Sequence, residues 1–532
     1  MPIWLQMPLL EAKIALSTPK GGFMADGSTK GTLPVPKKES RKTQLAMTVS
    51  SNLIWQAVNM VCGFIAPALI VGRFGSAING LLSSVGNFIS WLNLLEAGVG
   101  GATIAALYTP LARRDFTKIS GIVSAAKKFY FRSGVMFSSG IVIMAFVYPW
   151  IVRGQVAMLT SALLVLILGI TGTSGFFLIS KYSVLLIADK KQYIFTNLQA
   201  LFTVVNRVAM IALIKLGFDI VTVRLTSSLL YVSRFAFLYW YVKKHYPQVD
   251  YGASPDTKEI SQSRNVMVHQ FSGFIIGNTP VALLTFLVDL KEVSVYSIYS
   301  MIFGYVNGMI GSFSVGIHAF FGESIQKDSR RKMLLFFRSY ETLLYSVSFW
   351  FYTVGFILIM PFLSVYTTRM SDANYIRVDY ALLFVINRIL GQLRVPAAQM
   401  ISAHGHFKKT QWRALTEMII NTVASIIFTW KFGVIGVLLG RTVSHIYRDF
   451  DMIFYNAHLL KTSVLPTFAK IAFFTACALG YAKLSVLVDL SSKSFIEWII
   501  KAVVVALACS LPVLFVIARK AILLKAQRKG QH

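Results

Sequence analysis

The sequence is short of charge, and most of all of negative charge. Only 14% of its 532 residues are Asp, Glu, Lys or Arg, while 55% are hydrophobic. A soluble domain has about 25% charged residues. The 52 Lys and Arg residues outnumber the 22 acids and leave a formal net charge of +30. A chain with so few charges cannot cover a soluble surface, so the composition excludes an ordinary soluble protein and indicates a membrane protein.

Cysteine is also scarce. The three cysteines, Cys62, Cys477 and Cys509, all fall in apolar runs, where a free thiol behaves as a small hydrophobic group. Their spacing offers neither a disulfide framework nor a zinc motif. His404 and His406 flank Gly405 without a carboxylate or thiol nearby. We therefore expect no metal site.

The sequence motifs of soluble enzymes are missing. There is no phosphate-binding loop, no Gly-x-Ser-x-Gly elbow and no His-Glu-x-x-His zinc motif in the chain. We expect no enzymatic activity and no cofactor. The high positive charge also suggests nucleic acid as a partner, but a folded basic domain or an aromatic RNA-reading motif is missing. We therefore expect no nucleic-acid binding.

What the chain has instead is a long series of apolar segments. Each is about 20 residues, long enough to cross a hydrocarbon core of about 30 Å as a helix. The fold class that follows is an all-α, polytopic membrane protein with about 14 transmembrane helices. The predicted spans are residues 48–71, 81–107, 133–152, 158–187, 195–216, 221–242, 266–290, 293–317, 342–366, 380–401, 412–430, 434–455, 468–487 and 496–517.

The positive charges are concentrated in alternate loops. Lys and Arg crowd the segments 113–132, 243–264, 327–338 and 519–529, while the intervening loops are short and carry few. Cytoplasmic loops carry this excess of Lys and Arg. The pattern therefore predicts a multi-pass membrane protein with both termini in the cytoplasm.

A weak internal repeat divides the chain. Residues 105–115 and 318–328 both end an apolar segment and lead through an acidic residue, Asp115 or Asp328, into a basic amphipathic stretch. Each Asp is suited to capping a helix that starts there. We expect these stretches to lie on the cytoplasmic leaflet. Leu216-Gly217-Phe218 and Phe432-Gly433-Val434 form a second pair at nearly the same offset. Two halves of six helices predict parallel repeats, with a substrate site at their interface.

The repeat predicts two pseudo-symmetric six-helix lobes plus two C-terminal helices. The expected organisation is a disordered cytoplasmic tail (1–46), an N-terminal lobe (47–243), a cytoplasmic linker (244–265), a C-terminal lobe (266–460), two additional transmembrane helices (461–518) and a basic cytoplasmic tail (519–532).

Several charged residues fall inside the predicted spans, and most are arginines. A charge at the membrane centre costs about 2.5–3.5 kcal/mol on insertion scales, so such residues should face the protein interior or a water-filled cavity. Arginine binds phosphate through two parallel hydrogen bonds. The cavity predicted from these residues suits an anionic substrate better than a cationic drug. The predicted substrate-binding residues are Arg207, Arg224, Arg388, Arg394, Arg441 and Glu417.

Two acids inside the spans allow more than one interpretation. Glu417 has Arg413 one turn earlier, so a local ion pair is an alternative to a cavity role. Glu96 precedes a glycine-rich stretch at 98–101. It is a candidate for ion or proton coupling, or alternatively the counter-ion of an arginine.

Several segments resemble a known family. Residues 88–98 with Tyr108-Thr109-Pro110-Leu111-Ala112, residues 289–297, Tyr366-Thr367 with 372–376, and 405–410 with Glu417, Asn421 and 433–437 are similar to polysaccharide-biosynthesis flippases. That family belongs to the superfamily of multidrug, oligosaccharidyl-lipid and polysaccharide exporters. The resemblance covers residues 48–460. One departure is Pro280, where the family pattern suggests a polar or acidic residue, and Asp289 is expected to be structural.

The resemblance implies a V-shaped pair of lobes that work by alternating access. The implied function is a flippase that moves an undecaprenyl-diphosphate-linked oligosaccharide across the bacterial plasma membrane for lipopolysaccharide, capsule or exopolysaccharide synthesis. The implied partners are membrane lipids and the glycan polymerase and glycosyltransferases of the same pathway. A cation-coupled multidrug antiporter on the same fold is the alternative, which would favour acids and aromatic residues over arginines.

Overall fold

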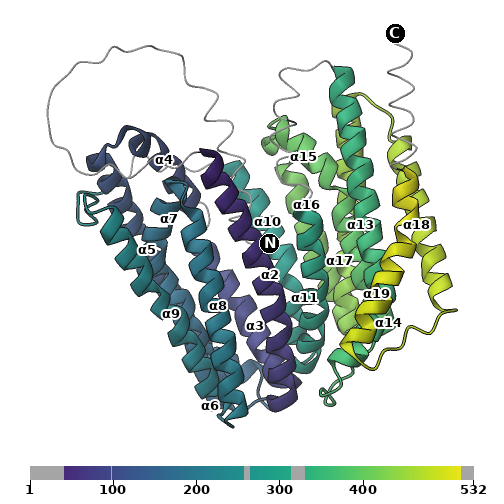
Figure 1. Cartoon of the computed structure of the whole chain (residues 1–532), viewed down its shortest axis with the longest axis horizontal. Helices are drawn as coiled ribbons and strands as arrows, with labels where there is room; N and C mark the ends of the chain where they lie inside the picture. The colour runs from purple at the N-terminus through teal and green to yellow at the C-terminus, as the bar shows by residue number, and fades with distance from the viewer. Residues whose placement is uncertain (1–40, 97–98, 257–263, 313–320, 322–329, 517–532) are drawn as a thin grey trace. The chain divides into compact units, whose positions relative to one another are not determined.

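The computed structural model describes residues 41–96, 99–256, 264–312, 321 and 330–516, and these residues are helical except for the connections between the helices (Figure 1). Residues 1–40, the predicted C-terminal tail and the acidic residue Asp328 of the second repeat pattern lie outside the described residues. Residues 41–46, predicted as part of the disordered N-terminal tail, are helical instead. The elements are α2 (Arg41–Phe74), α3 (Ser76–Leu92), the 3₁₀ helix η2 (Asn93–Glu96), α4 (Val99–Arg113), α5 (Phe116–Ile151), α6 (Met158–Ser174), the π-helix η3 (Gly175–Ile179), α7 (Ser180–Ala188), α8 (Gln192–Lys215), α9 (Ile220–His245), α10 (Arg264–Leu287), α11 (Leu290–Ser312), α13 (Arg330–Tyr366), α14 (Val378–Leu393), α15 (Val395–Ala403), α16 (Phe407–Phe432), α17 (Val434–Leu460), α18 (Leu465–Ser485) and α19 (Phe495–Cys509).

The predicted fold class, a helical membrane protein with many spans, is confirmed. Within the described residues, 11 helices are long and apolar enough to cross a membrane. The remaining predicted spans are helical too. One of them is divided among α3, η2 and α4, and the other two are α16 and α17, which carry several polar and charged side chains.

Apolar side chains point outward as well as inward, as a lipid environment requires. Phe146, Leu159 and Trp430 are 75%, 72% and 87% exposed. The two C-terminal helices α18 and α19 are apolar along their length yet bury few side chains. A soluble protein rarely exposes apolar patches of this extent, so these surfaces are suited to contact with lipid.

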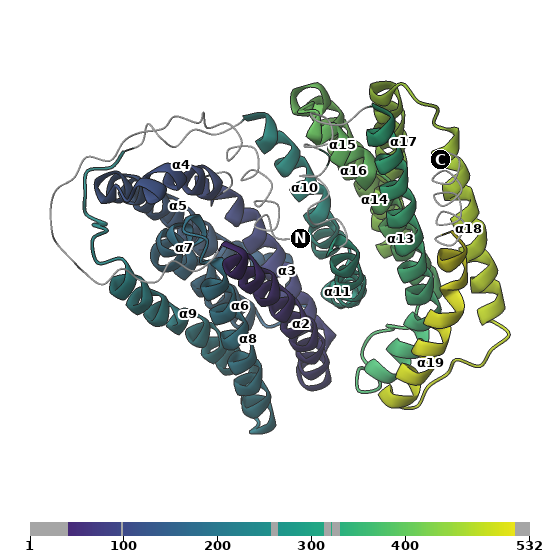
Figure 2. The ribbon, with the colours of Figure 1, turned by 45° about the horizontal axis from the view of Figure 1, so that its top comes forward.

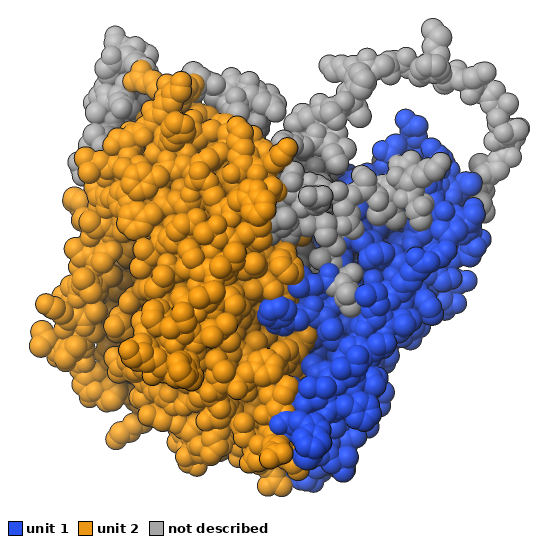
Figure 3. All heavy atoms as spheres, turned by 180° about the vertical axis from the view of Figure 1, so that it is seen from behind, with its two compact units in different colours: residues 1–66, 89–150, 158–263 blue, residues 67–88, 151–157, 264–532 orange. Residues whose placement is uncertain are grey.

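The described chain forms two compact units, coloured separately in Figure 3. Unit 1 contains residues 1–66, 89–150 and 158–263, and unit 2 contains 67–88, 151–157 and 264–532. Their first boundary falls at Pro67, inside α2, where the missing backbone N–H removes a helical hydrogen bond. The lobe bounds 47–243 and 266–460 stay a prediction.

The long helices α5 and α13 occupy equivalent places in the sequence repeat. They have 36 and 37 residues, begin in basic segments, and hold Pro149 and Pro361 close to their C-terminal ends. Asp115 caps α5, because its side chain accepts a hydrogen bond of 3.0 Å from the backbone N–H of Lys118. Capping by the acid that ends the repeated pattern is as the sequence predicts.

The first basic stretch, expected to lie on the cytoplasmic leaflet, is the first part of α5, which runs without a break from Phe116 to Ile151. Its apolar positions Ile119, Ile122, Val123 and Ala126 are fully buried. The segment after α9 packs on this part of α5: Ser124 donates a hydrogen bond to the carbonyl of Ala253 at 2.6 Å. These apolar side chains face protein, so lipid is not their partner.

An aromatic cluster in unit 2 holds α11 against α14. The rings of Tyr299 and Phe303 stack on Phe384 at centroid distances of 5.6 and 5.9 Å. The Tyr299 hydroxyl donates a hydrogen bond to the carbonyl of Tyr375 at 2.8 Å. This packing fixes the helix that carries Arg388, one turn after Phe384.

Asp289 is structural, as expected. Its side chain accepts a hydrogen bond of 2.7 Å from the backbone N–H of Glu292 at the start of α11. Pro280 lies inside α10, which continues past it to Leu287.

Candidate functional site

The helices α16 and α17 form a tight antiparallel hairpin, seen side by side in Figures 1 and 2. Gly433 makes the turn with a φ of +58°, a conformation that favours glycine. A Cβ on Gly436 would lie 2.0 Å from the carbonyl oxygen of Phe428, and one on Gly440 would lie 2.3 Å from the backbone N of Ser425. Glycine at these positions lets the two backbones approach closely, which brings the polar side chains of both helices together.

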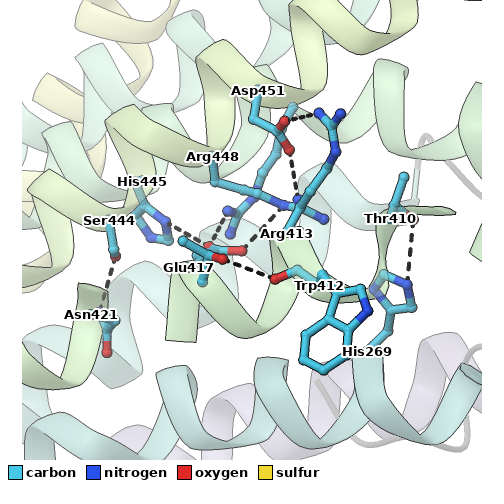
Figure 4. Close-up of polar contacts among 12 residues, drawn as sticks. His269, Thr410, Trp412, Arg413, Glu417, Asn421, Ser444, His445, Arg448 and Asp451 are labelled. Carbon is cyan, nitrogen blue, oxygen red and sulfur yellow. Dashed lines mark hydrogen bonds and ion pairs between the residues drawn. The ribbon is translucent and has the colours of Figure 1, made fainter. Parts of the chain in front are cut away.

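A buried carboxylate, Glu417 of α16, is the centre of the resulting polar network (Figure 4). It pairs with Arg394, at the junction of α14 and α15, and with the Nε of Arg448 at 3.3 Å. The Nδ1 of His445 lies 3.7 Å from its Oε1 atom. The sequence left open a local pair between Glu417 and Arg413, and the structure pairs Arg413 with Asp451 instead.

The network continues from Glu417 toward the surface. The Nη1 atom of Arg448 donates to Asp451 at 2.8 Å, and Asp451 also pairs with Arg413. The guanidinium of Arg413 lies 4.8 Å from the ring centroid of Tyr455. Arg413 and Asp451 line an open hollow of about 670 Å³, whose other walls are aromatic residues and His458 of α17. Ion pairs therefore connect a surface hollow with a buried carboxylate.

A second acid, Asp449, lies in the same part of α17 but has no such pairing. It is 4% exposed, and neither of its carboxylate oxygens has a hydrogen-bond partner among the residues that the structure describes. A buried polar atom without a partner costs about 1–3 kcal/mol, and more when it is charged. Such groups are uncommon in native proteins and call for an explanation.

Two of the predicted arginines, Arg388 and Arg441, lie near each other without a carboxylate. Arg388 contacts the backbone oxygen of Ser300 at 3.4 Å and its hydroxyl at 3.5 Å. Arg441 donates from Nε to the Nε2 of His445 at 3.2 Å. The two guanidinium groups are close enough to repel each other. Neither forms an ion pair within the described part of the chain.

Unit 1 has a comparable arginine pair on α8 and α9. The Nε atoms of Arg207 and Arg224 are buried and find no hydrogen-bond partner in the described segments, and the two charges repel each other. Nearby, Asn206 donates to the carbonyl of Ser227 at 2.7 Å and fixes the register of the hairpin. Of the described residues, none provides a carboxylate to either arginine. Both guanidinium groups therefore keep capacity for an anion.

Glu96 lies in unit 1 where two helices depart from α geometry. It ends the 3₁₀ helix η2, and it faces the hydroxyls of Tyr130 on α5 and Ser180, which directly follows the π-helix η3. Its Oε1 atom and the Tyr130 hydroxyl are buried without a hydrogen-bond partner that meets strict geometry. The described residues give Glu96 no cation, which removes support from the counter-ion interpretation.

The structure thus brings the predicted site residues together in three groups. Arg394 and Glu417 form an ion pair, Arg388 approaches Arg441, and Arg207 approaches Arg224. Sequence reasoning missed Arg448, Asp451, Asp449 and His445. Their spacing held an indication, since Arg441, His445 and Arg448 follow at four and three residues, which places them on one face of a helix.

No cluster of three or more His, Cys, Asp or Glu residues able to hold a metal occurs among the described residues.

Solved structures of transport proteins share this fold. A lipid II flippase, MurJ, in an inward closed conformation superposes with a TM-score of 0.62 at 13% identity, over 90% of this chain and all of that one. The MATE multidrug transporter DinF-BH gives 0.53 at 14% identity, over 82% of this chain and all of that one. An inward-facing MATE family transporter of the MOP superfamily gives 0.50 at 16% identity, over 80% of this chain and 97% of that one.

No family model and no curated protein matches the sequence. At these identities the structural likeness establishes the fold alone. The described chain is a polytopic helical membrane protein with the fold found in a lipid II flippase and in MATE multidrug transporters.

Proposed function

We propose that this protein is a flippase that moves an undecaprenyl-diphosphate-linked oligosaccharide across the bacterial plasma membrane by alternating access. It would serve surface polysaccharide synthesis, next to the glycosyltransferases and polymerase of that pathway. The termini would lie in the cytoplasm. The fold shared with a lipid II flippase supports a lipid-linked substrate, and the sequence resemblance supports the polysaccharide pathway.

The observation that carries the proposal is an excess of buried arginine over available acid. Arg207 with Arg224, and Arg388 with Arg441, are two pairs of like charges for which the described residues offer no carboxylate. A guanidinium stays charged and binds phosphate oxygens through two hydrogen bonds. An anionic group bearing phosphates would relieve the repulsion within such a pair. Arg394 and Glu417, in contrast, neutralise each other, so we assign them a positioning role.

The experiment that tests the proposal replaces Arg388 and Arg441 with Ala and with Lys. Flipping of an undecaprenyl-diphosphate-linked saccharide is measured in vesicles at equal amounts of inserted protein. Loss of a charge-assisted contact of about 1.5–3 kcal/mol should slow transport about 10- to 150-fold. Lys should restore part of it, because an ammonium cannot form the forked contact. The exposed Arg153→Ala is the matched control. Normal flipping by both Ala variants would contradict the proposal.

A cation-coupled antiporter is a second candidate, and Glu96 is the observation that favours it. A buried acid without a cation can exchange a proton, which is the property that coupled transport needs. We propose the same residue as the coupling site of a flippase. Glu96→Gln should abolish transport driven by an imposed gradient while substrate binding persists. Gradient-driven export of a cationic dye by the unchanged protein, without flipping of the saccharide, would favour the antiporter.

A further inference from the structure

The charges of the α16–α17 network balance only when one more acid is counted. Three arginines, Arg394, Arg413 and Arg448, share the two carboxylates Glu417 and Asp451. Asp449 is the remaining acid beside them. With Asp449 ionised, the network is neutral, and with Asp449 protonated it carries one positive charge. The state of this one carboxyl therefore decides the net charge of the network.

The surroundings of Asp449 leave it without a fixed partner. From the packed elements it is faced by Tyr345 of α13, Arg394 at the α14–α15 junction and Glu417 of α16, in addition to Arg448 on its own helix. The Tyr345 hydroxyl is already occupied, because it donates to the carbonyl of Leu393 at 2.7 Å. Within the described part of the chain, no donor reaches either oxygen of the 4%-exposed Asp449. Arg394, the cation that acts most strongly on Asp449, is paired with Glu417.

We propose that Asp449 is a proton-binding site whose occupancy switches the charge of this network and, through it, the affinity for an anion at Arg388 and Arg441. A proton enters from water together with the anion and returns to water when the anion leaves. The identity of the anion, a diphosphate, rests on the proposed function, whereas the proton site does not.

His445 lies between Arg441 and the network around Glu417. Its Nε2 atom accepts a hydrogen bond from Arg441. The ring hydrogen is therefore on Nδ1, which lies 3.7 Å from Glu417. Arg441 and Asp449 lie eight residues apart on α17, about 12 Å along the helix. One unit charge acting over that distance, at an effective dielectric constant of about 20, changes the affinity for a monovalent anion about tenfold.

The first arm of the test uses no ligand. Infrared difference spectra between low and high pH are recorded on purified protein in lipid nanodiscs. The protonated carboxyl band should be reduced in Asp449→Asn and moved in frequency in Asp449→Glu, which keeps an acid if the Asn variant does not fold. Asp489→Asn, an exposed acid in the α18–α19 connection, should leave the band unchanged. A spectrum that is the same in the wild-type protein and both Asp449 variants overturns the proton site.

The second arm uses undecaprenyl diphosphate as the probe, titrated calorimetrically in two buffers of different ionisation enthalpy. The wild-type protein should take up a fraction of a proton with the anion and lose affinity as the pH rises through the Asp449 titration, by more than the roughly tenfold expected for a monovalent anion, because a diphosphate carries more than one negative charge. Asp449→Asn should bind with a constant affinity and without proton uptake. Anion binding by the wild-type protein without any proton uptake overturns the coupling. Failure of the wild-type protein to bind the probe counts against the proposed substrate, and the infrared arm then decides the proton site alone.

Discussion

Two helical hairpins, one in each unit, hold equivalent places in the repeat but differ in chemistry. The α8–α9 hairpin turns at Gly217 with a φ of +87°, and the α16–α17 hairpin turns at Gly433 with a φ of +58°. The helices of the first carry arginines without acids. The helices of the second carry arginines and acids bound to one another, in addition to Arg441 and Asp449, which form no ion pair in the described part of the chain. A shared backbone geometry can therefore hold arginines with or without acids that neutralise them.

The difference suggests separate roles for the two hairpins, one in stability and one in anion binding. Removing one member of a buried ion pair is costly, although the pair itself contributes little compared with apolar residues of similar size. The α16–α17 network is therefore expected to hold its helices in one arrangement. The α8–α9 arginines repel each other, and under the proposed function a bound anion would relieve that repulsion. Mutations in the two hairpins should therefore separate an effect on stability from an effect on transport.

The largest effect should come from breaking the network at its centre. Glu417→Ala leaves Arg394 and Arg448 without their shared carboxylate. We expect the free energy of unfolding to fall by about 3–5 kcal/mol, measured by denaturant or thermal unfolding of purified protein in detergent. Glu497→Ala, which removes an exposed pair with Lys501 on α19, should change little. Equal stability of the two variants would show that the network does not hold the hairpin.

In unit 1 we expect a smaller effect, on transport and not on stability. Arg207→Ala and Arg224→Ala should reduce flipping about 10- to 150-fold, equivalent to about 1.5–3 kcal/mol of lost contact with the substrate. Their unfolding free energy should stay the same or rise, since a like-charge repulsion is removed. The matched variant in unit 2 is Arg448→Ala, which should lower stability instead. A loss of stability on removing Arg207 would mean that its role is structural.

The smallest effect concerns the turns themselves. Asp219 caps α9 by accepting hydrogen bonds from the backbone N–H groups of Val221 and Thr222 at 2.9 and 3.2 Å, whereas α17 begins at Gly433 without a side-chain cap. Asp219→Ala should cost about 1 kcal/mol of stability, read from unfolding curves. The α16–α17 hairpin offers no matching substitution, because no side chain caps α17.

The Asp219 cap also makes the stability of the α8–α9 hairpin depend on pH. Hydrogen bonds from Thr222 lower the pKa of Asp219 in the folded protein. An acid with a lowered pKa stabilises the fold above the pKa of the unfolded chain, about 3.9, and the contribution is lost as the pH falls through the folded value. Asp219→Asn keeps the cap and should remove this dependence below about pH 4. If the unfolding free energy of Asp219→Asn falls at acid pH as much as that of the wild-type protein, other carboxylates cause the fall.

The fold could be predicted from the sequence because its determinants are local. Apolar runs of span length give the helices, and Gly217 and Gly433 mark the turns of the two hairpins. Asp115 caps α5, as predicted. The basic stretch after Asp115 misled the prediction, because its amphipathic pattern is the same whether the apolar side faces lipid or protein. The hydrogen bond from Ser124 to Ala253, after α9, shows that this side of α5 faces protein. Sequence alone could not show it, because the two residues are 129 positions apart.

The candidate site was predicted only in part, since it depends on which helices are neighbours. Spacing identified Glu417, Arg394 and Arg441 as charges inside spans. It could not show that Arg394 lies beside Glu417, because the two belong to different helices and meet only after α14 to α17 pack together. The nearest basic residue in sequence, Arg413, was the natural partner to expect. The structure gives it to Asp451, on the neighbouring helix.

The polar character of α16 and α17 has a consequence for biogenesis. Neither is among the 11 described helices that are apolar and long enough to span a membrane, so each alone is a poor substrate for insertion. Once the chain turns at Gly433, Glu417 of one helix can neutralise Arg448 of the other. We therefore expect the insertion machinery to release the two helices together, as one preassembled pair, with α14 and its Arg394 already present in the bilayer.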